Sequence, residues 1–509
     1  MATQNEKIHD EEAAVQPRFK SSLEEYERDG EDRPPFVLTY TEVKLLGIAG
    51  VGFFLDGECF SYLNGIAPVA TMLQYRLYGG NKLPTGLEGF VKAGANIGSV
   101  IGQFAFGYMA DRYGRKAIYG KELMLIIFAT IMAISTPTGD LSPSGSLIYL
   151  AVFRIILGIG VGGDYPMSAS ITSDRANLRK RGTLLAYIFA NQGWGSLVGS
   201  LVVIIVLACY KHAMNDLGET SKVDGVWRIA VGLSLIPAFA TLYQRLTLPE
   251  SKRFLKSQEA PKPVEDDLTK PDSVQEKKPS PSVSSAKFLH YFSEWRHLKI
   301  LMATSGCWFL LDIAFYGINL NQNVVLQQIG FAGTSGTPWE RLFKISIGNI
   351  IITVLGFVPG YYVTVLTIEK LGRKWIQIQG FLLAALFLGI MAGRFHELSK
   401  VGFVVCFAFL QFFFNFGANA TTYVYPAEVF PTKYRATAHG VSAASGKAGA
   451  IISSLAFNEL SKNIGTPNVL WIFVGCCIAG AFVSLLLPEV KGRDPDLILE
   501  QELRERRAT

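Results

Sequence analysis

The sequence predicts an all-α membrane protein, with twelve transmembrane helices arranged as two related six-helix halves. Of its 509 residues, 49% are hydrophobic and 18% are charged, whereas soluble domains average about 25% charged residues. The charges gather in tails and short connectors, so the long apolar runs between them have no side that could face water. Similar charge motifs recur in the two halves of the chain, which indicates an internal repeat.

The apolar segments define the twelve predicted spans, at about 20 residues for each crossing. They lie near residues 45–70, 88–110, 117–136, 147–172, 183–208, 228–247, 299–324, 343–366, 374–394, 401–424, 436–456 and 468–487. Lys and Arg concentrate in alternate short connectors, which are expected to stay in the cytoplasm. Because an even number of spans puts both ends of the chain on one side, we expect a multi-pass plasma-membrane protein with both termini cytoplasmic.

A polar stretch in the middle of the chain separates the two predicted halves. Residues Leu255–Lys287 are rich in Pro, Ser, Lys and Glu, which is typical of a flexible linker. The predicted organisation is an N-terminal tail (1–41), a first half (42–250), a cytoplasmic linker (251–297), a second half (298–488) and a C-terminal tail (489–509).

The internal repeat rests on two matches between the halves. The segment Asp111–Lys116 corresponds to Glu369–Lys374, with a charged pair, one residue, and then Gly-Arg-Lys. An acid seven residues before an arginine also occurs in both halves, at Asp174 and Arg181 and again at Glu428 and Arg435. Two six-helix repeats around a site at the bilayer midplane are the organisation of an alternating-access transporter.

Ionisable residues lie deep within several predicted spans. They are Asp56, Asp164, Asp312 and Lys447. A charge at bilayer depth costs roughly 3 kcal/mol or more, so such residues usually face the protein interior or a water-filled path. Three acids and one base on different helices therefore predict a shared polar cavity, as in a transporter for a charged substrate.

Four motifs carry a resemblance to a known family. They are Gly107-x-x-x-Asp111-Arg112-x-Gly114-Arg115-Lys116, Arg154-x-x-x-Gly158-x-Gly160-x-Gly162, Pro249-Glu250-Ser251-x-Arg253 and Pro488-Glu489-Val490-Lys491-Gly492-Arg493. Together they resemble the major facilitator superfamily, and the last resembles the ending of its sugar-porter-like branches. We expect Asp111, Arg112 and Arg115 to take part in the cytoplasmic gate; a purely structural or topological role is the alternative.

Two further motifs resemble the proton-coupled phosphate symporters of fungi and plants. The segment Gly162–Ser170 contains their Gly-Gly-Asp-Tyr-Pro element, and the seventh span contains their Trp-x-x-x-Asp-x-x-x-Tyr pattern. The four-residue steps of this pattern put its three side chains on one face of a helix. The resemblance implies a phosphate site formed by Tyr165, Gln192, Trp308, Asp312, Tyr316, Asn419 and Lys447, with proton coupling through Asp56 and Asp164.

The chemistry of these residue types suits phosphate. Lys447 supplies positive charge, and the aromatic and amide side chains can donate hydrogen bonds to oxygen. A protonated phosphate also carries a P–OH donor, which the carboxylate of Asp312 can accept, whereas sulfate offers no such proton. Protons on Asp56 and Asp164 would cancel negative charge while the anion enters. For Asp164, a structural bond to a neighbouring helix is the alternative.

The sequence departs from the family pattern in the first span. The family commonly has Asp-x-x-Asp there, but this chain has Asp56 followed by Cys59 at the second acidic position, with Glu58 beside it. The number of coupled protons is therefore open. A glycerophosphodiester symporter is the first alternative, since relatives in the same branch carry such substrates; a sugar symporter and a nutrient-sensing transceptor are others.

Several other functions are not expected. The six histidines are scattered, and neither a nucleophile–base pair nor a metal-ligand spacing stands out, so we expect no enzyme, cofactor or metal centre. The expected partners are phosphate, protons and the lipid bilayer, without nucleic acid. For Lys121, Glu122 and Arg154 we expect a structural role, for which ion pairs between the third and fourth spans are one arrangement.

Overall fold

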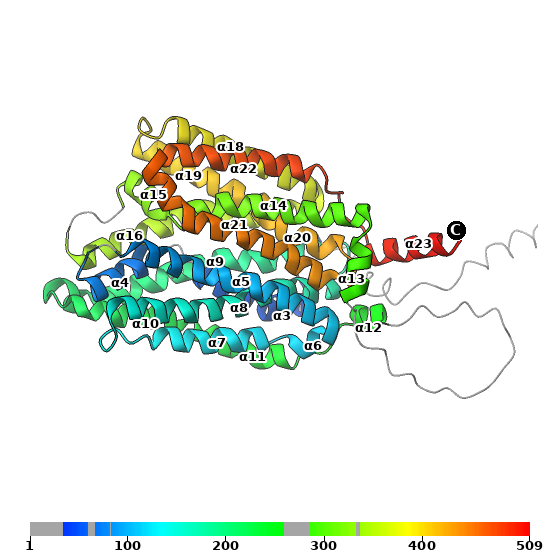
Figure 1. Cartoon of the computed structure of the whole chain (residues 1–509), viewed down its shortest axis with the longest axis horizontal. Helices are drawn as coiled ribbons and strands as arrows, with labels where there is room; N and C mark the ends of the chain where they lie inside the picture. Colours follow the sequence, from blue (N-terminus) through cyan, green and yellow to red (C-terminus); the bar gives the residue numbers. More distant parts are fainter. Residues whose placement is uncertain (1–33, 60–66, 82, 259–284, 332–335, 509) are drawn as a thin grey trace, which may run out of the picture.

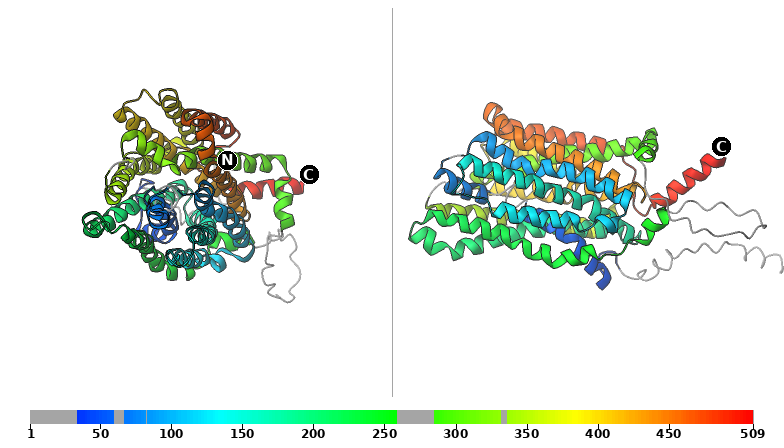
Figure 2. Two further views of the ribbon diagram at one scale, coloured as in Figure 1. Left: turned by 60° about the vertical axis from the view of Figure 1, so that its left-hand side comes forward. Right: turned by 60° about the horizontal axis from the view of Figure 1, so that its bottom comes forward.

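The computed structural model describes residues 34–59, 67–81, 83–258, 285–331 and 336–508, which form a bundle of roughly parallel helices (Figure 1). These residues contain no β-strand. In the left view of Figure 2, the helices of the first half (blue to green) lie beside those of the second half (green to red). Three helices extend from one end of the bundle, which we call the tail end: α12 (Lys252–Gln258), α13 (Ser285–Phe292) and α23 (Pro495–Ala508).

Each half of the chain contributes one set of helices. The first half contains α3 (Tyr40–Cys59), α4 (Ala67–Tyr78), α5 (Thr85–Tyr113), α6 (Arg115–Ile118), α7 (Lys121–Ile134), α8 (Pro143–Arg175), α9 (Arg181–Cys209), η2 (His212–Asp216), η3 (Thr220–Lys222), α10 (Val223–Leu233) and α11 (Leu235–Leu246). The second half contains α14 (Trp295–Asn319), α15 (Gln322–Ile329), α16 (Pro338–Ile352), η4 (Thr353–Phe357), α17 (Val358–Leu371), α18 (Arg373–Gly393), α19 (Lys400–Asn415), α20 (Ala418–Val429), α21 (Arg435–Ile464) and α22 (Thr466–Ser484).

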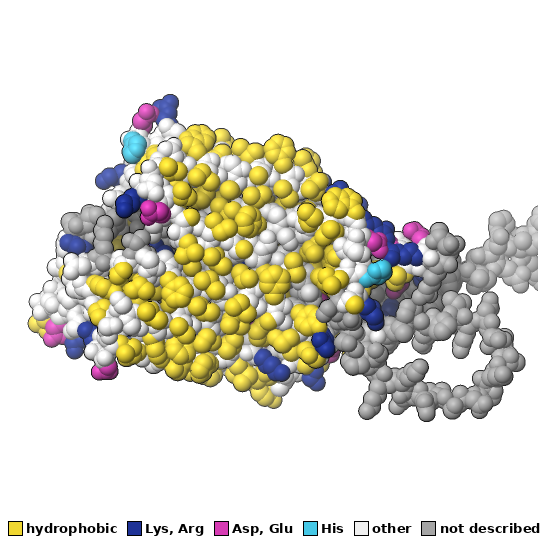
Figure 3. All heavy atoms as spheres, viewed as in Figure 1, with side chains coloured by type: hydrophobic (Ala, Val, Ile, Leu, Met, Phe, Trp, Pro, Cys, Tyr) yellow, Lys and Arg dark blue, Asp and Glu magenta, His cyan; other side chains and the backbone are white. Residues whose placement is uncertain are grey.

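The helices confirm the predicted fold class. In the described part of the chain, nine helical segments are long and apolar enough to cross a membrane. Helices α3, α5 and α21 supply the remaining three predicted spans, and each carries ionisable residues that lower its hydropathy. Apolar side chains cover the middle of the face shown in Figure 3, while charged side chains lie mainly at its two ends. This distribution matches a lipid-embedded belt between two water-facing ends.

The structure differs from the sequence prediction in several segments. The eighth span contains the π-helical turn η4 between α16 and α17, and the tenth span is divided into α19 and α20 at residues 416–417. The sixth span, expected as one helix, is divided into α10 and α11 at Ser234, because Pro237 has no N–H to donate to the preceding turn. The predicted linker and C-terminal tail include helices α12, α13 and α23, so their polar composition does not prevent helix formation. Residues 259–284 of the linker and 1–33 of the N-terminal tail lie outside the described residues.

Helices α5 and α8 pack closely because glycines face each other along their contact. A Cβ atom at Gly98 would lie 1.9 Å from the carbonyl oxygen of Ile155, and one at Gly158 would lie 2.1 Å from that of Ala95. Such distances are impossible for real atoms, so the two backbones can approach this closely only where side chains are missing. Small residues have this role in many membrane helix pairs.

We therefore predict that Gly98→Ala destabilises the protein. Overpacking a close contact costs about 1–3 kcal/mol, and here the obstacle is backbone rather than a movable side chain. The matched control is Gly475→Ala in α22, where the added Cβ meets nothing within 4 Å. Thermal unfolding in detergent should show a lower midpoint for Gly98→Ala and an unchanged or slightly higher one for the control. Equal midpoints for the two variants would contradict the packing described here.

Candidate functional site

The residues predicted for substrate binding and proton coupling come from six helices and all lie in the interior. Each of them exposes 9% or less of its surface. They are Asp56 on α3, Asp164 and Tyr165 on α8, Gln192 on α9, Trp308, Asp312 and Tyr316 on α14, Asn419 on α20, and Lys447 on α21. Because α3, α8 and α9 belong to the first half and the others to the second, these residues meet where the two halves face each other.

Within the first half, Asp56 accepts the hydrogen bonds of the neighbouring predicted site residues. Its Oδ2 atom accepts a hydrogen bond of 2.7 Å from the Tyr165 hydroxyl and one of 2.8 Å from Gln192 Nε2. Both donors approach the same oxygen, so Oδ2 accepts from α8 and from α9 at once. The side chains of the neighbouring Glu58 and Cys59, which concern the departure from the family pattern, lie outside the described residues.

A hydrogen-bonded chain continues from Gln192 into the second half. Gln192 Oε1 accepts from the hydroxyl of Tyr361 on α17 at 2.9 Å, and that hydroxyl accepts from Asn419 Nδ2 at 2.9 Å. Asn419 also donates to Asn415 Oδ1 at 2.8 Å. Both predicted amides thus form helix–helix hydrogen bonds in this state.

Tyr361 was missed by the sequence analysis. It is followed directly by Tyr362, and nothing in the sequence distinguishes the two side chains. The structure does: Tyr361 is 1% exposed and bonded across the halves, whereas the Tyr362 hydroxyl accepts from Trp194 at the bundle surface. The two tyrosines can be told apart only when it is known which neighbouring helix each of them faces.

Lys447 lies among aromatic rings. Its ammonium hydrogen-bonds the Tyr316 hydroxyl and lies 4.3 Å from the centre of the Tyr316 ring and 5.2 Å from that of Tyr165. Both are cation–π distances. The Trp308 ring in turn lies 6.1 Å from that of Tyr165. A cation held by rings rather than by a carboxylate keeps its charge available to an anion.

Asp312 lies in the field of Lys447 and of Asp56. Among the described residues no donor reaches its Oδ2 atom, although the side chain is 1% exposed. A buried oxygen without a partner is costly, so it points to a ligand or a water as its usual partner. The site therefore contains a buried cation and, near it, a buried acceptor with free capacity.

Asp164 is held apart from this cluster by Arg245, a residue that the sequence analysis missed. Arg245 Nη1 bonds Asp164 Oδ1 and, at 3.1 Å, Glu122 Oε1. The other nitrogens of Arg245 donate to the backbone oxygens of Ile48 and Ala49. The structural alternative considered for Asp164, a bond to a neighbouring helix, is thus present in this state.

The structure does not contain the ion pairs that the sequence suggested between the third and fourth spans for Lys121, Glu122 and Arg154, all of which are described residues. Glu122 pairs with Arg245 of the sixth span instead. Arg154 Nε donates to the Val91 backbone oxygen on α5 at 2.8 Å, and Lys121 is exposed. The reason is geometric: the sequence gives the depth of a residue within its span but does not show which neighbouring span its side chain faces.

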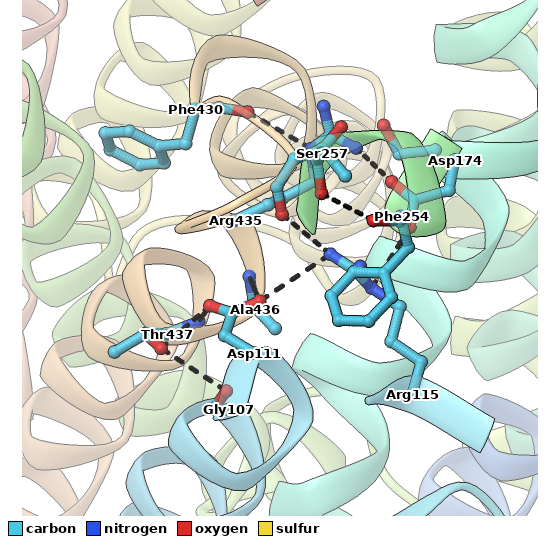
Figure 4. Close-up of polar contacts among 12 residues, drawn as sticks. Gly107, Asp111, Arg115, Asp174, Phe254, Ser257, Phe430, Arg435, Ala436 and Thr437 are labelled. Carbon is cyan, nitrogen blue, oxygen red and sulfur yellow. Dashed lines mark hydrogen bonds and ion pairs between the residues drawn. The ribbon is translucent and has the colours of Figure 1, made fainter. Parts of the chain in front are cut away.

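The tail end of the bundle is closed by contacts between the halves (Figure 4). Asp111 on α5 accepts hydrogen bonds from the backbone nitrogen of Thr437 at 2.7 Å and from its hydroxyl at 2.8 Å. It thereby caps the N-terminus of α21, where negative charge is favoured. Asp174 on α8 pairs with Arg115 at 3.0 Å and with Arg435 of the second half.

Of the three predicted gate residues, two take part in this contact. Arg115 also donates to the Thr432 backbone oxygen at 2.9 Å, so it joins the halves as Asp111 does. Arg112 is exposed, and its Nη1 donates to the hydroxyl of Tyr108 on its own helix. Among the described residues, Arg112 therefore lies beside the contact between the halves without joining it.

The repeated motif places the second half's residues in equivalent contacts. Glu369, the counterpart of Asp111, accepts from the Thr183 backbone nitrogen at the start of α9, at 3.1 Å. Arg373, the counterpart of Arg115, bonds both oxygens of Glu428 at 2.7 and 2.8 Å. The internal repeat is thus expressed as two related networks at the tail end.

The opposite end of the bundle, which we call the far end, is also bridged. Trp339 Nε1 on α16 donates to the Leu207 backbone oxygen on α9 at 2.6 Å. The Thr337 hydroxyl donates to Asn215 Oδ1 at 2.7 Å. The buried polar cluster is therefore bounded at both ends by contacts between the halves. Within the described ranges no group of three or more His, Cys, Asp or Glu residues is placed to hold a metal ion.

We predict that Asp174→Asn opens the tail end. The variant loses two buried ion pairs, and a shift of at least about 1.4 kcal/mol toward the open arrangement corresponds to about a tenfold change in population. A cysteine replacing the buried Ser173, on a background without the native cysteines, should then react with a maleimide about ten times faster. Asp216→Asn, at an exposed far-end acid, is the control. Unchanged labelling in Asp174→Asn would contradict a role for this contact in closure.

Comparison with known proteins gives the family. The model of the sugar (and other) transporter family matches residues 54–500. The inorganic phosphate transporter PHO84 of Saccharomyces cerevisiae is 37% identical, over 91% of this chain and 84% of its own length. The repressible high-affinity phosphate permease of Neurospora crassa is 36% identical, over 90% and 86%.

Solved structures agree in fold. The major facilitator proton:xylose symporter XylE superposes with a TM-score of 0.69, covering 89% of this chain and 98% of that protein. At 19% identity this likeness concerns the fold alone. With its helices, its repeated tail-end motif and these matches, the chain has the fold of that major facilitator symporter and belongs to the sugar (and other) transporter family.

Proposed function

We propose that this protein is a proton-coupled importer of inorganic phosphate that works by alternating access of two halves, residues 42–250 and 298–488. The observation that carries the proposal is the pairing, in one enclosed interior, of the buried Lys447 ammonium with the unpartnered carboxylate oxygen of Asp312. The names of its relatives PHO84 and the Neurospora permease support the same substrate.

The proposed anion site uses the residues around Lys447. Phosphate oxygens would accept from Lys447 and from the hydroxyls of Tyr165 and Tyr316, with Trp308, Gln192 and Asn419 completing the donor set. The P–OH group of a protonated phosphate would donate to Asp312, whose free oxygen has no other donor among the described residues. An acid beside the anion then favours a ligand that carries a proton. Sulfate carries none and is therefore disfavoured.

Proton coupling is assigned to Asp56 and Asp164. A proton on Asp56 removes a negative charge that faces the incoming anion, and its loss to the other side restores the repulsion and favours release. Asp164 forms a buried ion pair with Arg245 within the first half, so a change in the charge of Asp164 alters that pair. The membrane potential assists uptake only if more protons than anionic charges move inward.

The tail end is proposed to face the cytoplasm of the cell, in the plasma membrane. Its connectors carry the excess of Lys and Arg that marks cytoplasmic loops. The contacts of Asp111 and Arg115 would then break when phosphate is released inward. Arg112, which lies outside the contact between the halves, is assigned to topology rather than to gating.

The proposal is tested by uptake of labelled phosphate into liposomes that contain the purified protein. An inward proton gradient should drive accumulation, and neither sulfate, glycerophosphocholine nor glucose should compete. Strong competition by glycerophosphocholine would move the substrate to a glycerophosphodiester, and competition by glucose would move it to a sugar. Absence of phosphate uptake in any gradient would reject the proposal.

We further predict that Asp312→Asn weakens discrimination between phosphate and sulfate. The amide cannot accept the P–OH proton as a carboxylate does, and it no longer repels an unprotonated anion. Since an unmatched buried polar group costs about 1–3 kcal/mol, the ratio of the two inhibition constants should fall about tenfold or more. Asp140→Asn, at an exposed loop acid, should leave the ratio unchanged. A ratio equal to the wild-type value in Asp312→Asn would contradict the assigned role.

A further inference from the structure

The buried guanidinium of Arg245 contacts two carboxylates at a single nitrogen atom. Its Nη1 atom bonds Asp164 Oδ1 and lies 3.1 Å from Glu122 Oε1. The three side chains come from α11, α8 and α7, and none of them exposes more than 2% of its surface. We call Glu122, Asp164 and Arg245 the acid–arginine triad. All of its charges lie inside the protein, within the predicted spans.

The triad contains one cation for two acids. Within the described ranges, every ion pair of Asp164 and of Glu122 is made with Arg245. The other donors to these carboxylates are neutral: the Gly120 backbone nitrogen reaches Glu122 Oε1 at 2.8 Å, and the Ser168 hydroxyl reaches Asp164 Oδ1 at 3.0 Å. Two negative charges therefore share a single positive charge when both acids are ionised.

Among the described residues, the surroundings of the triad supply no second cation at ion-pair distance. From α3, two backbone oxygens accept from the other nitrogens of Arg245 at 3.0 and 3.2 Å, and Asp56 on the same helix adds negative charge. The phenols of Tyr119 and of Tyr423 on α20, which are neutral, also face the triad. The buried cation Lys447 bonds a tyrosine of the substrate site instead. The neighbouring groups thus leave the excess negative charge in place.

One proton makes the triad neutral. With both acids ionised, the interior would hold an uncompensated negative charge, and two carboxylates that share a site bind a proton more readily than either would alone. Each acid also has an oxygen that no described donor reaches, Asp164 Oδ2 and Glu122 Oε2. A proton can bind at either acid while the other acid stays bonded to Nη1 of Arg245. The proton therefore belongs to the pair rather than to one residue.

We propose that Glu122 is a further proton-coupling residue: it and Asp164 bind one proton between them around Arg245 and act as a single proton-binding pair. The inference rests on the proposed function. When a proton arrives, an O–H bond forms at one of the two free oxygens, and the triad becomes neutral. When the proton leaves to the opposite side, that O–H bond breaks, water accepts the proton, and the triad regains its negative charge.

The pair explains how Asp164 can be bonded to Arg245 and still bind a proton. Asp164 alone with Arg245 would form a neutral ion pair, and a proton on Asp164 would leave the guanidinium uncompensated. Glu122 removes this obstacle, because it stays bonded to Arg245 when Asp164 is protonated. The structural contact of Asp164 is therefore compatible with its proposed role in coupling. The pair also limits the number of protons, since its two acids bind one proton and not two.

The test measures the number of protons that enter with each phosphate, in liposomes that contain the purified protein. A pH-sensitive dye reports proton entry, and labelled phosphate reports substrate entry. We expect Glu122→Gln to carry one proton fewer for each phosphate than wild type, because the remaining acid and Arg245 are neutral without a proton. Asp164→Asn should lose the same proton, and the double variant should lose no second one. Glu122→Asp, which keeps the acid, should keep the wild-type ratio.

The matched control is Glu88→Gln. Glu88 is a glutamate on α5 whose cation is Lys92, at 2.8 Å, and in the described part of the chain no second acid pairs with that lysine. Because Glu88 and Lys92 balance each other, no proton is needed for neutrality there. The ratio of protons to phosphate should therefore be the same in Glu88→Gln as in wild type.

An unchanged ratio in Glu122→Gln would overturn the inference and leave the proposed function in place, and so would a double variant that loses two protons. Absence of gradient-driven phosphate uptake in wild type would instead reject the proposed function. If Glu122→Gln does not fold, pH-difference infrared spectra of the wild-type protein with carbon-13 in its glutamate carboxyl groups decide. A glutamate band that is abolished in Asp164→Asn supports the inference, and its absence contradicts it.

Discussion

The organisation of this protein depends on one constraint: charges buried at the interface between the halves must find partners, and many of those partners lie on the other half. Asp174 pairs with Arg115 of its own half and with Arg435 of the other. Asp111 caps the first turn of a helix from the second half. In a low-dielectric interior the attraction within such a pair is stronger than at a surface, and removing one partner leaves an uncompensated buried charge. Two arrangements with different pairings can therefore be distinct states.

The two halves are alike at the tail end and different at the centre, and the two regions serve different purposes. At the tail end, the repeated motif produces related networks, so Glu369 and Arg373 use helix caps and ion pairs much as Asp111 and Arg115 do. At the centre, the halves differ: the first presents the acid Asp56, and the second presents Lys447 together with the acid Asp312. Symmetric ends suit a rocking motion that treats both halves alike, whereas an asymmetric centre can hold an anion on one side and a proton on the other.

The sequence predicted the spans well because length and hydropathy are set by the bilayer, which acts on every helix in the same way. It also predicted which residues lie at depth, since Asp312 and Lys447 are too costly to expose to lipid. Partners were harder to predict. Arg245, near the end of its span, is not distinguishable by sequence from a residue that fixes topology, yet it bonds two acids from other helices.

The same limit explains Tyr361 and Arg112. A tyrosine in an apolar span has no cost that marks it, so its role depends on Gln192 and Asn419 facing it from other helices. Arg112 belongs to the motif that predicted the gate, but a helical step turns its side chain away from the neighbour that Asp111 and Arg115 face. Depth in the membrane is therefore encoded locally, whereas pairing between spans depends on how the helices pack.

The central claim is that closure of the two halves depends jointly on the charge of the site and on a bound anion. Distances between spin labels test it most directly, with Tyr113 and Trp375 labelled at the tail end and Leu217 and Val401 at the far end, all of them exposed. At low pH, adding phosphate is predicted to change the distances at both ends, because the proton-loaded site then holds its anion between the halves. Distance distributions that do not respond to phosphate at low pH would contradict the account.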